Sequence, residues 1–147
     1  MKRDNRQPGL EMRVDREARR ISNQHRQLDE FYGMVVSSLE GGMLARARSE
    51  FVRFHDALEA HFQVEEQIHF PALHGLAPEL DAELASLVEE HREFRERLER
   101  LAELFERGDA ARCARDLDGL VVELATHEGR EERIGRHVAG RNGRSSG

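Results

Sequence analysis

Six side chains stand out because their types and spacing suit metal ligation. They are His25, His61, Glu65, His91, His127 and Glu131. Two of the histidines are followed by a glutamate four residues later, and all six fall on apolar stripes. Residues four apart lie one turn apart on the same face of a helix, so each histidine–glutamate pair directs an imidazole and a carboxylate into one space. Mixed nitrogen and oxygen ligands of this kind suit iron or manganese, and zinc less well.

The segments that carry these residues have the pattern of amphipathic helices. Apolar residues recur at steps of three and four through four stretches separated by breaks at 41–42, 75–78 and 108–109. Glycine past a helix end, with Pro or Asp before the next start, is typical of such breaks. We predict an all-α fold, an antiparallel up-down-up-down four-helix bundle. Pro71 is expected to end or kink the second helix because it cannot continue the hydrogen-bond ladder.

The level of the six side chains along the bundle axis follows from hairpin geometry. Two residues of an antiparallel hairpin lie at the same level when they are equally far from the turn. Each successive pair of the four histidines is centred on one of the breaks, so the imidazoles should share one layer. The second and fourth helices run in the same direction, so Glu65 and Glu131 project to the same side.

A buried layer of this composition needs compensation. Burying carboxylates and imidazoles in an apolar core costs on the order of several kcal/mol per charge. Two cations would offset that cost, and helical bundles with inward histidines and carboxylates commonly hold two irons. We therefore predict a dinuclear site, with iron favoured over manganese or zinc. The alternative is a set of core histidines held by hydrogen bonds, with the glutamates paired to arginines.

The four remaining histidines are expected at the surface. His55, His69 and His137 fall beside the apolar stripes, and His74 falls in a break. His69 is the doubtful one, because it follows His61 by two turns on a neighbouring face. Tyr32, one heptad after His25, is expected to pack in the core; the alternative is a hydrogen-bond donor facing the metal site.

The length of 147 residues suits one domain, which we place at residues 15–138 between mobile tails at 1–14 and 139–147. No apolar run reaches the roughly 20 residues that span a bilayer, and the start lacks the apolar centre of a signal peptide. We expect a cytoplasmic protein with no membrane partner. A net charge of −6 argues against nucleic acid as a partner. The single cysteine, Cys113, excludes an internal disulfide framework and is expected to be a small buried apolar residue.

The sequence resembles the hemerythrin-like (HHE cation-binding) family over roughly residues 16–138. The resemblance rests on His25, the run His61 to Glu66, Phe70-Pro71-Ala72-Leu73, Glu90-His91, and the run His127 to Glu132. It implies two iron ions with an oxo or hydroxo bridge, both bridged as well by Glu65 and Glu131. It also implies that the histidines divide between the metals as two pairs, His25 with His61, and His91 with His127.

Activities of that family include reversible O2 binding, sensing of oxygen or iron, and reactions with nitric oxide or peroxide. Its oxygen carriers have a fifth histidine four residues after the third-helix histidine, where this chain has Arg95. Coordination positions would then stay open, as in reactive rather than structural centres. We expect a protein that binds or senses O2 or a related small oxidant, such as another diatomic molecule or peroxide. The alternatives are a redox enzyme acting on peroxide or nitric oxide, with catalytic residues unassigned, and an iron-sensing or storage module with a structural metal.

Overall fold

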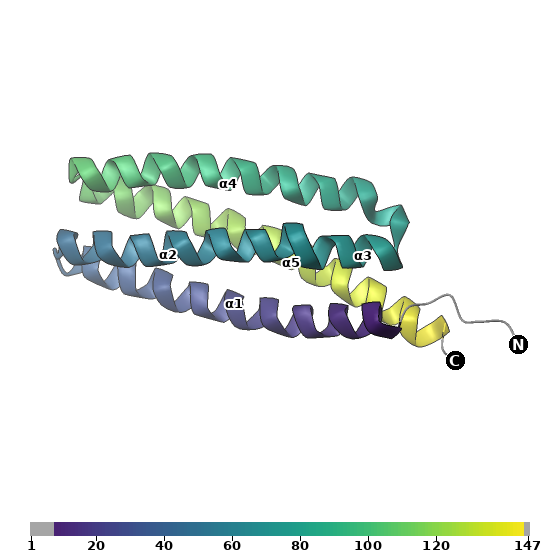
Figure 1. Cartoon of the computed structure of the whole chain (residues 1–147). Coiled ribbons are helices and arrows are strands. Elements are labelled where there is room, and N and C mark those ends of the chain that lie inside the picture. The colour runs from purple at the N-terminus through teal and green to yellow at the C-terminus, as the bar shows by residue number, and fades with distance from the viewer. Residues whose placement is uncertain (1–7, 146–147) are drawn as a thin grey trace, which may run out of the picture.

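The computed structural model describes residues 8–145, which are helical almost throughout and contain no strand. The elements are α1 (Pro8–Glu40), α2 (Leu44–Val64), η1 (Glu65–His69), α3 (Phe70–Leu76), η2 (Pro78–Leu80), α4 (Asp81–Arg107) and α5 (Ala110–Ser145). Because α2, η1 and α3 follow one another along one arm, the molecule is a bundle of four helical arms (Figure 1). In Figure 1, α1 and α4 run in one direction, and the α2–α3 arm and α5 run in the other. The all-α four-helix fold predicted from the sequence is confirmed.

Glycines with positive φ end two of the arms. Gly42 has φ 73° and Gly108 has φ 75°, values that L side chains rarely adopt. The N–H of Gly108 donates to carbonyl groups of the last turn of α4. Asp109 caps the N-terminus of α5, because its Oδ1 accepts a hydrogen bond from the Arg112 N–H at 3.1 Å. These local signals fix where the chain reverses.

The interruption predicted at Pro71 takes the form of a wider turn. η1 is a π-turn, in which the Phe70 N–H donates to the Glu65 carbonyl five residues back. Pro71 is the second residue of α3 and lies in its first turn, where proline is tolerated. The second arm therefore continues through Pro71 instead of ending there.

The helices extend beyond the predicted domain limits of 15 and 138. α1 begins at Pro8, and α5 continues to Ser145. Proline suits the first position of a helix, and a glycine inside one costs only about 1 kcal/mol relative to alanine. The sequence signals taken for tails are therefore compatible with helix. Residues 1–7 and 146–147 of the predicted tails lie outside the described residues, and mobility of the ends stays a prediction.

A polar layer divides the apolar core into two clusters. The larger cluster includes Leu28, Leu58, Phe94 and Leu124. The smaller cluster includes Phe70, Leu87 and Ile134. On the second, third and fourth arms, the predicted ligand histidine lies between a residue of one cluster and a residue of the other. The apolar packing on both sides thus fixes the level of the layer.

Two further expectations concern Cys113 and the membrane. Cys113 is fully buried in the larger cluster, as predicted, and burial raises the pKa of its thiol to about 11. No helix within residues 8–145 has both the length and the apolar character needed to cross a bilayer. The cytoplasmic location stays a prediction.

Candidate metal centre

The structure brings all six predicted ligands into one buried layer. Their exposed fractions range from 0% to 8%. They form two groups, in each of which the potential ligand atoms lie within 4.8 Å of one another. The groups are His25, His61, Glu65 and Glu131, and Glu65, His91, His127 and Glu131. Both glutamates belong to both groups, which is the arrangement expected of carboxylates that bridge two metals.

Carboxylates behind the layer fix the tautomers of two histidines. His91 Nδ1 donates to Glu66 Oε2 at 2.6 Å, and His127 Nδ1 donates to Glu90 Oε1 at 2.6 Å. Burial is the main cause that lowers the pKa of His127, which favours the neutral ring. A neutral imidazole protonated at Nδ1 carries a lone pair on Nε2, and the two Nε2 atoms lie 3.1 Å apart. Two lone pairs at that distance repel each other, whereas a cation bound by both removes the conflict.

Arginines support both of these outer carboxylates. Arg95 Nη1 donates to Glu66 Oε2 at 3.0 Å, and its Nε donates to Glu59 Oε1 at 2.7 Å. Arg130 donates to Glu90 in the same way. Arg95 stands where oxygen carriers of the resembled family have a fifth histidine, and its guanidinium is bonded to carboxylates behind the layer. Its role here is to hold Glu66 in place, and through Glu66 the ring of His91.

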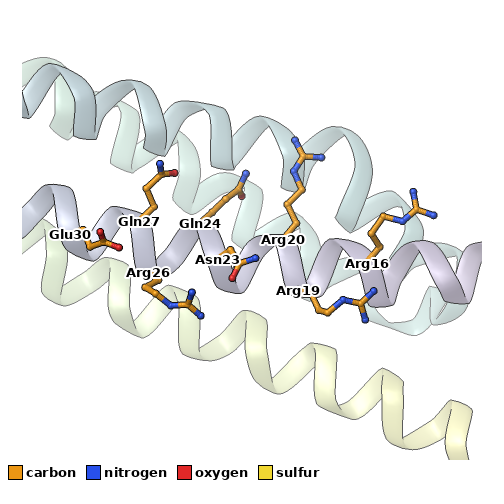
Figure 2. A pocket seen from close by; sticks show the side chains of 8 residues that line it. All are labelled: Arg16, Arg19, Arg20, Asn23, Gln24, Arg26, Gln27 and Glu30. Carbon is orange, nitrogen blue, oxygen red and sulfur yellow. The ribbon is translucent and has the colours of Figure 1, made fainter.

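His61 has a neutral outer partner on α1. Its Nδ1 donates to Gln24 Oε1 at 2.8 Å. Figure 2 shows Gln24 among the side chains that line a surface depression of about 600 Å³ along α1. Gln24 directly precedes His25, just as Glu90 directly precedes His91. In both cases the residue before a ligand on one helix holds the ligand histidine of another.

The same depression carries four exposed arginines, Arg16, Arg19, Arg20 and Arg26. They extend away from α1 in several directions (Figure 2). Arg20 lies 3.4 Å from Glu17, a buried carboxylate. This face is a solvated surface of the helix.

Glu65 and Glu131, the two glutamates that both groups share, have the clearest need of a cation. All four carboxylate oxygens of Glu65 and Glu131 are buried without a well-aligned hydrogen-bond donor among the described residues, although imidazole nitrogens of the same layer lie close: His91 Nε2 is 2.9 Å from Glu65 Oε1, and His61 Nε2 is 3.2 Å from Glu65 Oε2. Burial raises the pKa of Glu65, but nearby His61 and His91 outweigh that effect and lower it to about 2. A buried, ionised carboxylate without donors costs on the order of several kcal/mol. The donor set therefore fits metal ions that are bound by these oxygens and by the imidazole nitrogens.

His25 lies at the open side of the layer, near a carboxylate that the sequence analysis missed. Burial and the neighbouring His61 lower the pKa of His25 to about 4, so its ring is neutral near pH 7. Its Nε2 lies 3.7 Å from Glu131 Oε1 and 3.7 Å from Glu128 Oε2. Burial and three nearby carboxylates raise the pKa of Glu128 to about 8. Its place beside His127 in the sequence is the only signal that points to it.

The surface prediction for His69 is wrong. His69 is 5% exposed and lines a cavity of about 500 Å³ together with His25, Glu65 and Glu131. Burial is the main cause that lowers the pKa of His69. The prediction assumed a regular helix from His61 onward, whereas η1 changes the direction in which later side chains project.

The cavity joins the layer to the surface near the beginning of α1 and the end of α5. Exposed Asp15 and Arg136 belong to its wall, as do the apolar side chains of Ile21 and Val138. α1 begins and α5 ends on the same side of the bundle (Figure 1). A small molecule can therefore reach the ligand layer from this end.

The remaining predictions for individual side chains hold. His74 and His137 are exposed, and His55 is partly exposed. Tyr32 packs against the larger apolar cluster, and its hydroxyl donates to Asp118 Oδ1 at 2.9 Å. Tyr32 thus faces away from the metal layer.

Comparison with known proteins agrees with this geometry. The family model for the hemerythrin HHE cation binding domain matches residues 17–134, a span that includes all six predicted ligands. No curated protein and no solved structure gave a significant match. The match extends over all four arms of the bundle and confirms the resemblance found in the sequence. The chain belongs to the hemerythrin HHE cation-binding family.

Proposed function

We propose that this centre holds two iron ions and binds O2 or a related small oxidant. The observation that carries the proposal is that both ligand groups contain Glu65 and Glu131. Two separate single-metal sites would need ligand sets of their own, whereas shared carboxylates suit a metal pair. The layer lies between two apolar clusters, which limits the access of water to it.

Binding of a small oxidant requires coordination positions that the protein leaves free. Four imidazoles and two bridging carboxylates do not complete the shells of two six-coordinate metals, and open positions are typical of reactive centres. His25, Glu65 and Glu131 line the cavity, so the open positions would be reached from that side. When bound, iron supplies the redox chemistry with O2. The side chains would hold the metals, and the carboxylates of Glu66 and Glu90 orient the imidazoles of His91 and His127 toward them.

The test is an absorption spectrum of iron-loaded protein, recorded without oxygen and again after exposure to air. We expect a charge-transfer band that depends on O2, and no such band in protein loaded with zinc, which is redox-inert. An unchanged spectrum in iron-loaded protein would contradict O2 binding. Continuous consumption of added peroxide would instead identify a redox enzyme.

A further inference from the structure

His69 is a buried polar side chain without a role in the metal layer described above. It is 5% exposed, and its Nδ1 is buried with no hydrogen-bond partner among the described residues. Leaving a buried polar atom unsatisfied costs about 1–3 kcal/mol. Such groups are rare in folded proteins, and each calls for an explanation.

The π-turn explains how His69 reaches the cavity. On a regular α-helix, residues eight apart are turned by about 80° around the axis, which would place His69 on a different face from His61. A π-turn holds more residues per turn, so the side chains that follow Glu65 are turned back toward the inner face. Glu65 is the first residue of η1 and His69 is the last, and both line the same cavity. Single π-turns occur often at functional sites.

His69 is a poor candidate for a further metal ligand. Among the described residues, neither group of converging ligand atoms includes it. It does lie within electrostatic range of Glu65, His61 and the buried Glu17. The ring is therefore close to the layer but outside the shell of atoms that would touch the metals.

We propose that His69 is the hydrogen-bonding residue of the ligand cavity, and that it binds a small anion or polar diatomic molecule held at the metal centre. This inference rests on the proposed function, because it requires a ligand in the cavity. Nδ1 is buried with no acceptor among the described residues, so the neutral ring is better protonated on Nε2, and Nδ1 remains an unpartnered acceptor. Nε2–H can then donate to a ligand that carries negative charge. A hydrogen bond to a charged group is stronger than one between neutral groups.

The test uses azide as the probe and the iron-loaded full-length protein. His69→Phe keeps an aromatic ring but removes both nitrogens, and His69→Gln keeps a donor and an acceptor. His74→Phe is the matched control, because His74 is an exposed histidine of α3 that pairs with Asp81. The dissociation constant is read from the azide-to-iron absorption band, and the iron content of each variant is measured alongside.

We expect azide to bind about tenfold more weakly to His69→Phe, a loss typical of one hydrogen bond to a charged group. His69→Gln should stay within about threefold of the wild type, and His74→Phe should match it. All variants should keep the same iron content. Equal affinity in His69→Phe and wild type would overturn the proposal, as would a His69→Gln variant as weak as His69→Phe. Iron loss in both His69 variants would overturn it too, since His69 would then be a metal ligand. Wild-type protein that holds iron but binds neither azide nor O2 would contradict the proposed function itself.

Discussion

His91 and His127 face each other with their Nε2 atoms 3.1 Å apart, while the Nδ1 of each ring donates to a carboxylate. The two rings come from α4 and α5, which pack side by side. Because Glu66 and Glu90 accept hydrogen bonds from the two Nδ1–H groups, an imidazole with its single proton on Nδ1 has only the lone pair of Nε2 to offer the other ring. This geometry is the strongest local argument that the layer is built around cations.

The outer carboxylates should therefore tune metal affinity. Replacing Glu66 with Gln keeps an acceptor for His91 but removes its charge, so the imidazole becomes a weaker ligand. We expect metal affinity to fall about tenfold, within the range typical of changes behind a metal site. Competition with a chelator measures this. Glu96→Gln, which changes an exposed carboxylate paired with Arg92, is the control and should leave affinity unchanged. Equal affinities for all three proteins would show that the Glu66 carboxylate does not act on the site.

Glu131 should have opposite effects on stability with and without metal. Its two oxygens are buried without a hydrogen bond from the described residues. In metal-free protein, Glu131→Gln removes a buried charge, so the variant should melt at or above the wild-type temperature. In metal-loaded protein the wild type should melt at a higher temperature than the variant, because folded wild-type protein binds the metal more tightly than folded Glu131→Gln does. Thermal melting with and without a chelator tests the crossover, and a variant that is less stable in both states would contradict it.

Glu128 should make the metal-free fold less stable at alkaline pH. Its pKa rises from an ordinary value of 4.5 to about 8 in the folded protein, chiefly through burial. The folded state therefore favours the protonated carboxyl, and that contribution is complete below pH 4.5 and lost as the pH rises through 8. Glu128→Gln removes this dependence.

The measurement is denaturant unfolding of the metal-free protein and the variant at pH 5 and pH 8. Relative to the wild type, the free energy of unfolding of Glu128→Gln should rise by about 3.5 kcal/mol between pH 5 and pH 8. Titrating groups that do not contact Glu128 affect both proteins alike and cancel in the difference. His25, whose Nε2 lies 3.7 Å from Glu128 Oε2, has a pKa of about 4 in the folded protein and does not titrate between pH 5 and pH 8. A parallel change in the two proteins would show that Glu128 titrates near its ordinary pKa.

The sequence predicts much of the fold because its local signals agree with one another. Apolar spacing sets the inner face of each helix, and glycine marks the reversals at Gly42 and Gly108. The histidine–glutamate spacing and the hairpin symmetry place the six predicted ligands at one level without any knowledge of tertiary contacts. These features depend on positions along one helix or across one turn, and such positions can be read from a sequence.

The features that the sequence analysis missed depend on contacts between helices. Gln24, Glu66 and Glu90 are ordinary polar residues on helices rich in charge, and only tertiary packing shows that each holds a ligand histidine. His69 was misplaced for a different reason. Pro71 predicts a disturbance of the helix, but it does not say that the disturbance will be a π-turn that redirects His69 inward.

The most direct test of the central claim is the number of metal ions per chain. Protein loaded with iron and freed of excess should contain two irons per chain by elemental analysis. His25→Ala should retain about one, since it removes a ligand from one group only, and Glu65→Ala should retain fewer still, because Glu65 belongs to both groups. A wild-type protein that binds a single iron or none under these conditions would contradict the two-metal centre.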